Sequence, residues 1–378
     1  MSHESIKYIA YFDTQDSKIK RNFVTSAANK LEYIAKVIAS TGKKVDIISI
    51  SEVTEDKFHL YRSEKKWIAD GVNLCLPFSW GGNNVLAIKL KRLWHPLRLF
   101  FYLLFNCVKE DKVVVYHSLG YFNFILWAKK LKGFKLVLEV EEIYSDVSPM
   151  SSYWRNLEFK MFDIADSFIL SNDLLDAIIN KNHKPSTVVY GTYHVEPKRV
   201  SKFNDGKIHI VYAGTFDHNK VGAKTAIQAS QYLPSNYHIH ICGFGTEEDT
   251  FEVKRLIADA QIISKSTITY DGLKKGSEFI EFLQSCHIGL STQNPKGEYN
   301  DTSFPSKVLT YMANGLSVVS IRIPVLEKAS IAKSISFYDV PDGVALAKAI
   351  VNCRIENHQE SLLRKLETCL IESIKCIL

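Results

Sequence analysis

Short apolar runs recur along the first half of the chain, and stretches with a helical period separate them. The runs are rich in β-branched residues, which is typical of buried strands. They lie at residues 7–12, 45–50, 113–116, 135–140, 168–170 and 187–189. Between them, residues 23–40 and 121–132 place apolar side chains on one helical face. Strands that alternate with helices predict a parallel, doubly wound α/β sheet.

The same pattern starts again after a polar segment at residues 197–206, which contains Pro, Asn, Asp and Gly and predicts a linker. New strand-like runs lie at residues 208–212, 238–242, 267–270, 288–291 and 317–321. We therefore expect two Rossmann-like domains at residues 1–196 and 206–343. Residues 344–378 predict helices that pack back toward the first domain. Two such domains predict a cleft between them, with ligands at the carboxyl ends of the strands.

Length and cysteine usage indicate a two-domain protein with reduced thiols. A chain of 378 residues suits two domains, each with its own core. The seven cysteines stand singly, and none forms a Cys/His cluster with zinc spacing, so we expect reduced thiols in the cytoplasm. The start of the chain shows no signal-peptide pattern, and no apolar run is long enough to span a bilayer.

Charge is distributed unevenly, because the whole net charge of +6 comes from residues 1–200. A basic first half predicts an anionic partner, such as a phosphate or lipid head groups. No nucleic-acid motif accompanies it, so we expect no nucleic-acid partner. Residues 71–109 contain no acidic residue and interleave basic with aromatic side chains. The basic residues are Lys89, Lys91, Arg92, Arg98 and Lys109. This segment predicts a helix on an anionic membrane, or else a core helix with basic solvent edges.

The most informative local motif is TSFPSKVLTYMANGLSVV at residues 302–319. Pro305 suits the first position of a helix and Gly315 the position just after its end, so we expect a helix at residues 305–314. The backbone N–H groups of Ser306 and Lys307 and the Lys307 ammonium would meet at its start. Such a helix start predicts a diphosphate site. The alternative is an ordinary helix between two strands.

Two glycine-containing loops fit the same ligand. Gly214 and Thr215 follow the first strand of the second half, where a phosphate can approach the backbone closely, and Lys220 lies a few residues on. Gly243-Phe244-Gly245 follows the next strand. Neither a G-x-x-x-x-G-K-[ST] loop nor a G-x-G-x-x-G fingerprint is present, which argues against a P-loop enzyme and a dinucleotide dehydrogenase.

These pieces, in this order, resemble the donor-binding domain of family 4 retaining glycosyltransferases, which have the GT-B fold. The resemblance covers residues 208–320 and includes Tyr270-Asp271-Gly272. It implies catalytic roles for Lys220 and Lys307. It also implies donor-binding roles for Gly214, Thr215, Gly243, Phe244, Gly245, Gly272, Phe304, Pro305, Ser306 and Thr310. The chain departs from the family pattern where Thr302 and Thr310 replace two glutamates.

The first half offers candidates for the transferred sugar and the acceptor. His117 follows the strand at residues 113–116, and in similar enzymes a histidine there contacts the transferred sugar; a structural loop histidine is the alternative. Glu139, Glu141 and Glu142 end the next strand, where a carboxylate can polarise an acceptor hydroxyl. Asn29 lies near the start of the first helix and suggests a further acceptor contact. Capping or solvated roles are the alternative for these acidic residues.

The sequence therefore predicts transfer of a sugar from UDP- or GDP-sugar to a glycan or lipid-linked acceptor, with retained configuration, in surface-polysaccharide synthesis. No D-x-D motif stands in a plausible loop, so we expect no metal and no cofactor, with Lys220, Lys307 and the helix dipole replacing them. The alternatives are a nucleotide-sugar epimerase of similar fold and a non-catalytic partner that binds a nucleotide-sugar.

Overall fold

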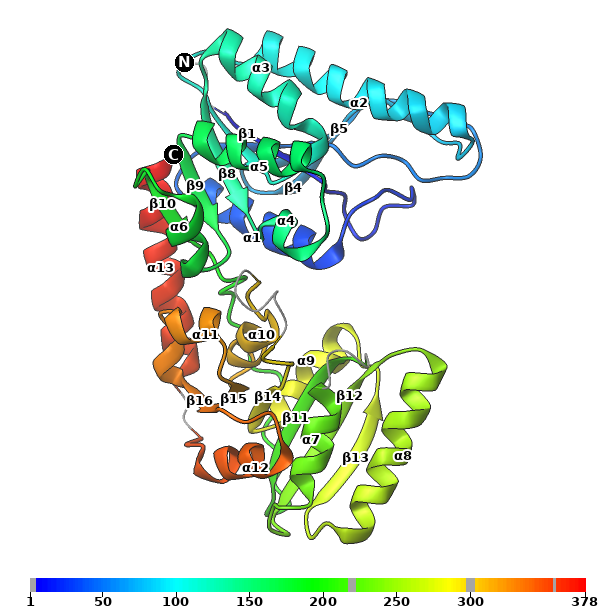
Figure 1. Ribbon diagram of the computed structural model, residues 1–378, viewed down its shortest axis with the longest axis vertical. Helices are drawn as coiled ribbons and strands as arrows, with labels where there is room; N and C mark the ends of the chain where they lie inside the picture. The colour runs from blue at the N-terminus through cyan, green and yellow to red at the C-terminus, as the bar shows by residue number, and fades with distance from the viewer. Residues whose placement is uncertain (1–4, 217–221, 297–302, 356–357) are drawn as a thin grey trace. The chain divides into compact units, whose positions relative to one another are not determined.

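The computed structural model describes residues 5–216, 222–296, 303–355 and 358–378 (Figure 1). The chain divides into two compact units, one of residues 1–192 with 368–378 and one of residues 193–367. Among the described residues, no helix is both long and apolar enough to cross a membrane.

The first unit is built on an eight-stranded sheet with the order β10-β9-β8-β7-β1-β2-β5-β4. All neighbours run parallel except β4, which is antiparallel to β5. The strands are β1 Ser5–Ala10, β2 Lys44–Ser49, β4 Glu64–Ala69, β5 Val72–Leu76, β7 Lys112–Tyr116, β8 Lys135–Val140, β9 Ser167–Leu170 and β10 Ser186–Val188; β3 Leu60–Tyr61 and β6 Ser79–Trp80 form a separate pair. The predicted parallel sheet is confirmed, and β4 and β5 are additions to it that the pattern did not predict.

Helices alternate with these strands. They are α1 Thr25–Ser40, α2 Val85–Asn106, α3 Phe122–Lys132, α4 Tyr144–Val147, α5 Ser152–Ile164 and α6 Asp173–Ile179. The longest is α2, which begins where the Asn84 side chain accepts a hydrogen bond of 2.8 Å from Ala87 N. Leu99 and Leu103 of α2 are fully buried in the core beside Phe122 of α3.

The other side of α2 stays exposed, and its basic residues divide into two groups. Lys89 and Arg92 are exposed, together with Leu86, Leu93 and Phe105 among the apolar residues. In contrast, the Lys91 side chain is buried and its ammonium donates to Val53 O at 2.8 Å and to Gly82 O at 3.0 Å. Arg98 is also largely buried. The prediction that Lys91 and Arg98 belong to a membrane-facing surface is therefore wrong, because their side chains lie in the interior of the unit.

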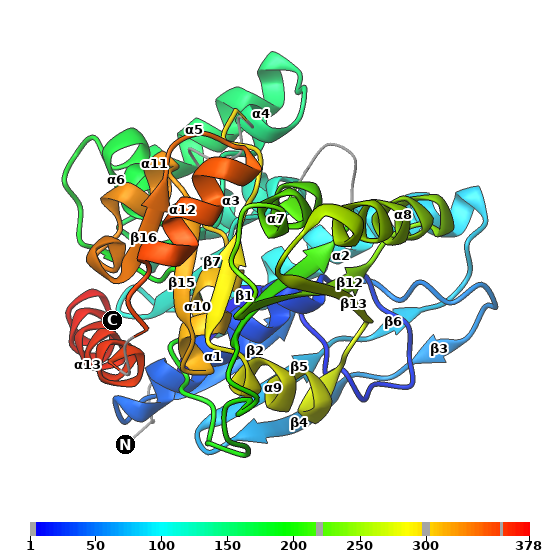
Figure 2. The ribbon, with the colours of Figure 1, turned by 90° about the horizontal axis from the view of Figure 1, so that it is seen from below.

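The second unit has a six-stranded, all-parallel sheet with the order β13-β12-β11-β14-β15-β16. The strands are β11 Ile208–Thr215, β12 Tyr237–Phe244, β13 Thr267–Gly272, β14 Ile288–Ser291, β15 Ser317–Ile321 and β16 Ile335–Tyr338. The helices are α7 Gly222–Ser230, α8 Glu247–Ile263, α9 Gly276–Ser285, α10 Lys307–Ala313, α11 Pro324–Lys328 and α12 Gly343–Asn352; α13 Gln359–Ile377 begins in this unit and ends in the other. Figure 2 shows α7 and α8 on one side of β12 and β13 and α9 on the other.

The strand order of this sheet reverses between β11 and β14, which lie side by side although β12 and β13 come between them in the chain. In open α/β sheets, ligands bind at such a switch point, outside the carboxyl ends of the strands. The switch point therefore directs attention to the loops that follow β11 and β14.

Candidate functional site

The carboxyl ends of β11 and β12 are paired through their last residues. The strands extend through Thr215 and Phe244, with Gly214 opposite Gly243, so the prediction that β11 ends at residue 212 was too short. Gly243 has φ +151, and a Cβ atom there would lie 1.8 Å from Gly214 O. Gly245 is similarly confined, because its Cβ would lie 2.8 Å from the Asp249 side chain. Close contacts with neighbouring backbone and side-chain atoms thus explain both glycines of the G-x-G loop.

Helix α10 begins at Lys307, two residues later than predicted, although Ser306 already has helical dihedral angles (φ −53, ψ −27). Its end is as expected. Gly315 has φ +73, and Leu316 N donates to Tyr311 O at 3.0 Å, which caps the last turn in the manner of a Schellman motif.

A tyrosine fastens this helix to the neighbouring strand. The Tyr311 side chain is fully buried, and its hydroxyl accepts a hydrogen bond of 2.9 Å from Ala213 N. Gly289 of β14 leaves room for it, because a Cβ atom there would lie 2.3 Å from the Tyr311 ring. Helix α10 is therefore held beside the carboxyl-terminal part of β11.

As a result, Lys307 lies over the switch point. Its Nζ atom is 4.6 Å from the centroid of the Tyr212 ring, a cation–π contact, and 3.1 Å from the position that a Cβ of Gly214 would take. The structure thus brings together two predicted residues from far apart in the sequence. It adds Tyr212, whose role only the cross-strand geometry reveals.

The other predicted donor-binding residues are less uniform. Thr215, Phe244 and Ser306 are exposed, Gly245, Pro305 and Thr310 are half-buried, and Phe304 is buried. Thr310 Oγ1 donates to Ser306 O at 3.2 Å, so its hydroxyl can still accept a hydrogen bond. Gly272 ends β13 with φ +73, opposite Cys242. Lys220 and Thr302 lie outside the described residues.

His117 does not have the open environment that contact with a sugar needs. Its side chain is 1 % exposed and stacks on the Tyr144 ring, with centroids 4.3 Å apart. Nε2 lies 3.1 Å from the Glu158 carboxylate. Burial raises the pKa of Glu158, but hydrogen bonds from His117 and from two backbone N–H groups outweigh it and lower that pKa overall. The expectation that His117 faces an open cleft is corrected, because its own unit encloses the ring.

The predicted acceptor residues lie near the carboxyl end of β8. Lys30 of α1 forms an ion pair of 2.7 Å with Glu141, and its neighbour Asn29 is exposed and accepts a hydrogen bond of 2.8 Å from Gln15. Glu142 is half-buried, and burial first, then Glu141, raises its pKa. Lys30 is thus a partner that the sequence pattern did not reveal.

Glu139 is the most buried of these acids. It is 1 % exposed, and it accepts a hydrogen bond from the Tyr8 hydroxyl. Burial, followed by the negative charge of Glu141, raises the pKa of Glu139 to about 8. Burial and the neighbouring charge therefore favour the protonated form of this carboxyl over the ionised form.

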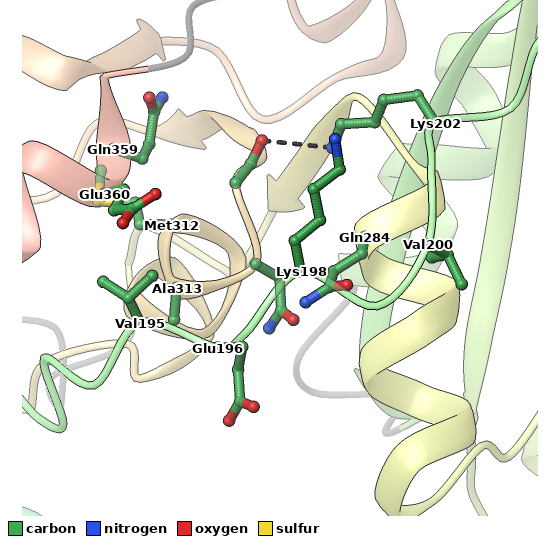
Figure 3. A pocket seen from close by; sticks show the side chains of 12 residues that line it. Val195, Glu196, Lys198, Val200, Lys202, Gln284, Met312, Ala313, Gln359 and Glu360 are labelled. Atoms are coloured by element: carbon green, nitrogen blue, oxygen red, sulfur yellow. Dashed lines mark hydrogen bonds between the residues drawn. The ribbon is translucent and has the colours of Figure 1, made fainter.

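A pocket of about 340 Å³ lies at the opposite end of α10 from Lys307 (Figure 3). Its lining includes Lys198, Gln284 and Gly315 and, within the part of the chain that the structure describes, none of the predicted site residues. The Lys202 ammonium donates to Cys286 O and Gly315 O, and burial lowers the pKa of Lys202 to about 8. Lys202 therefore links the end of α10 to the end of α9, and we assign this pocket no part in donor binding.

Comparison with known proteins identifies the fold. No family model and no curated protein sequence matches the chain. Among solved structures, one from E. coli named for trehalose-6-phosphate and bound with UDP-2-fluoro glucose is 9% identical, with a TM-score of 0.62 and 99% of each chain covered. Sucrose-phosphate synthase from Thermosynechococcus elongatus is 12% identical (TM-score 0.61), covering 99% of this chain and 94% of that chain. A glycosyltransferase from Rickettsia africae is 13% identical (TM-score 0.60), covering 100% and 94%. The chain therefore has the GT-B fold, as predicted.

Proposed function

We propose that this protein is a retaining glycosyltransferase that binds a nucleotide-sugar with its diphosphate against Gly214 and Lys307. The observation that carries the proposal is the position of the Lys307 ammonium directly over Gly214 at the switch point of the sheet. Glycine allows a phosphate to approach the backbone closely, and the neighbouring lysine supplies the charge that a phosphate needs. The UDP-sugar bound to the E. coli structure of the same fold supports this ligand class.

In this proposal the chemistry is charge stabilisation of the leaving group. As the bond between sugar and phosphate breaks, negative charge grows on the diphosphate, and the Lys307 ammonium neutralises it. The exposed Ser306 and the half-buried Thr310 are close enough along α10 to add contacts from the same helix. The leaving phosphate takes the proton of the acceptor hydroxyl, which is consistent with retained configuration. Lys220 would add a second positive charge.

We assign the acceptor to the first unit, where Asn29, Glu141 and Glu142 lie near the end of β8. A glycan or lipid-linked acceptor of surface-polysaccharide synthesis fits the exposed part of α2, which carries Lys89 and Arg92 among apolar side chains. A surface of this kind is suited to the anionic inner face of a membrane. We propose that the protein works in the cytoplasm at that surface.

The similarity to sucrose-phosphate synthase raises one other acceptor class, a small sugar phosphate. The exposed apolar surface of α2 favours the lipid-linked acceptor, because a small soluble acceptor has no need of it.

A two-stage experiment tests the proposal. UDP-, GDP- and other activated sugars are first compared by thermal shift, since a ligand that binds the folded state raises the melting temperature. The donor that stabilises the protein is then supplied in radiolabelled form with membrane lipid extract or with hexose phosphates. We expect label in the lipid fraction. Label in a sugar phosphate would change the acceptor, label in an epimer of the donor would indicate an epimerase, and binding without turnover would indicate a non-catalytic partner.

A further inference from the structure

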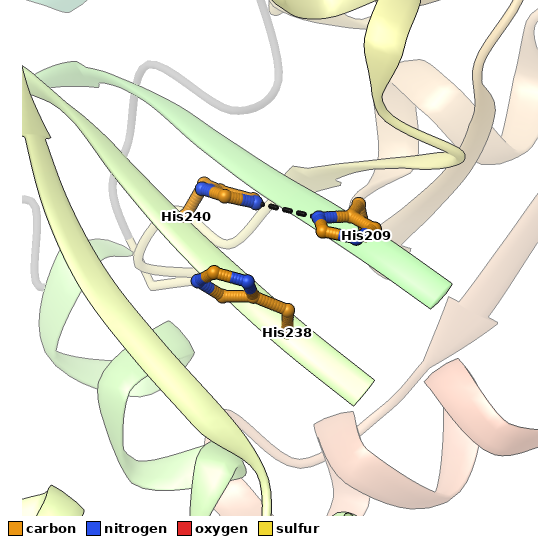
Figure 4. Close-up of side chains that lie close together, drawn as sticks. All are labelled: His209, His238 and His240. Carbon is orange, nitrogen blue, oxygen red and sulfur yellow. Dashed lines mark hydrogen bonds between the residues drawn. The ribbon is translucent and has the colours of Figure 1, made fainter. Parts of the chain in front are cut away.

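Three histidines meet on the sheet of the second unit, near the amino ends of its strands. His209 of β11 and His238 of β12 are register partners, and His240 follows two residues after His238, so all three project from one face. One nitrogen of each ring lies within 4.8 Å of one nitrogen of each of the other two rings (Figure 4). Five residues of strand, about 16 Å, separate His209 from Gly214. The cluster is therefore distinct from the candidate donor site.

Two carboxylates hold the outer nitrogens of two of these rings. Asp205 lies 2.9 Å from His209 Nε2, and Asp271 lies 3.1 Å from His240 Nδ1. Ionised carboxylates only accept hydrogen bonds, so both of these nitrogens must carry the ring proton. A carboxylate behind a histidine is also the usual outer partner of a metal-bound imidazole, because it fixes the tautomer and the orientation of the ring.

The other nitrogen of each of these two rings, here called the inner nitrogen, carries no proton and therefore acts as a hydrogen-bond acceptor. The two inner nitrogens face each other. His209 Nδ1 and His240 Nε2 are 2.9 Å apart. In neutral rings whose protons point at Asp205 and Asp271, both inner nitrogens present lone pairs, which repel each other. A cation between them, either a shared proton or a metal ion, removes that repulsion. His209 and His240 are 3 % and 4 % exposed, so water is poorly placed to fill this role.

The third histidine favours a metal ion over a proton. His238 Nε2 lies 3.1 Å from Thr269 Oγ1, which itself donates to Asp271 at 2.9 Å, so Nε2 carries the proton and Nδ1 retains a lone pair. The rings of His238 and His240 are stacked with centroids 3.9 Å apart. A shared proton needs two nitrogens, whereas a metal ion can use all three.

We propose that His209, His238 and His240 form a zinc-binding site. Imidazole nitrogens bind Zn²⁺ at 2.0–2.1 Å, which places tetrahedral ligand atoms about 3.3 Å apart. His209 Nδ1 and His240 Nε2, 2.9 Å apart, are slightly closer than that, and the three ligand nitrogens all lie within 4.8 Å of one another, so rotations of the rings complete the site. His238 is half-buried and gives the ion and a fourth ligand, water, a route from solvent. Phe203 and Phe282 pack against the other two rings, with centroids 4.2 Å from His209 and 5.2 Å from His240.

Such an ion would join β11 to β12 at the end of the sheet remote from the donor site. Its role is therefore structural, and the inference does not depend on the proposed transferase activity.

The test is isothermal titration of ZnCl2 into the untagged full-length protein after treatment with chelator and dialysis, because a polyhistidine tag would itself bind zinc. We expect one zinc ion per chain and a higher melting temperature with zinc. His238→Asn should weaken binding at least tenfold, since it removes a ligand at the half-buried position. His183→Asn, a change at an exposed histidine of the first unit, is the matched control and should bind zinc as the wild type does.

Asp271→Asn provides a second variant that leaves all three ligands in place. Loss of an outer partner typically costs 10–100-fold in metal affinity, and we expect a reduction in that range. Circular dichroism confirms that each variant is folded. Wild-type protein that binds no zinc would overturn the proposal and leave a shared proton as the cation. Equal zinc affinity in wild type and folded His238→Asn would overturn it as well.

Discussion

Replacing Lys307 by alanine removes the positive charge that the proposed mechanism places against the leaving diphosphate. A phosphate oxygen seated on Gly214 would come within hydrogen-bonding distance of the Lys307 ammonium, because that ammonium already lies 3.1 Å from the Cβ position of Gly214. Two unit charges about 4 Å apart interact by about 4 kcal/mol at an effective dielectric constant of about 20. Loss of one donor to a developing negative charge typically lowers kcat by about 100- to 1000-fold, which agrees with that energy.

The same substitution should leave the protein folded. It also removes the cation–π interaction between Lys307 and the buried Tyr212 ring, and an interaction of this kind contributes about 0.5–2 kcal/mol, more as it is desolvated. The assay is release of nucleoside diphosphate from the preferred donor, together with the melting temperature of each variant. Lys207→Ala is the control, because it removes one positive charge just before β11 begins, where Lys207 bonds to Thr267 at 2.7 Å. Turnover of Lys307→Ala within threefold of the wild type would refute the reasoning.

Three further outcomes are expected. Omission of divalent metals with EDTA present should leave transferase activity intact, because lysine charge is proposed to replace a metal; a loss that magnesium reverses would contradict this. Glu139→Gln should become more stable than the wild type as the pH rises from about 4.5 to about 8. The raised pKa of Glu139 means that ionisation of its carboxyl destabilises the folded wild type over that window, on the order of a few kcal/mol. The measurement is the free energy of unfolding in urea at several pH values, and a difference between the two proteins that stays constant with pH would refute the assignment. Binding to anionic vesicles should fall when Lys89 and Arg92 become serine, by about 1 kcal/mol for each charge, and should be unaffected by the same change at Lys254 and Arg255 of α8; equal binding to neutral vesicles would exclude the membrane surface.

The alternation of strands and helices was predictable because buried parallel strands are short apolar runs. The end of α10 was predictable too, since Gly315 takes a backbone conformation that other residues avoid. The hairpin of β4 and β5 was missed, although its Asp70-Gly71 turn is a local hairpin signal and Gly71 has φ +77. Its flanking segments are partly exposed and lack a continuous apolar run.

Contacts between distant residues were harder to predict, because they depend on register and on neighbouring elements. Lys91 has the sequence context of a surface residue, yet backbone carbonyls of two separate loops surround its ammonium. His117 follows a strand as expected, yet Tyr144 and Glu158 enclose it from segments further along the chain. The histidine cluster arises because the alignment of β11 with β12 places His209 beside H-x-H, and no spacing within one segment encodes that.

The central claim is that the diphosphate of the donor binds against Gly214 and Lys307. A crystal structure with the nucleoside diphosphate that most raises the melting temperature tests it most directly. The account predicts phosphate oxygens within about 3 Å of Lys307 Nζ, at hydrogen-bonding distance, and against the backbone of Gly214. A nucleotide bound at the other end of α10, in the pocket beside Lys198, with its phosphates remote from Lys307, would contradict it.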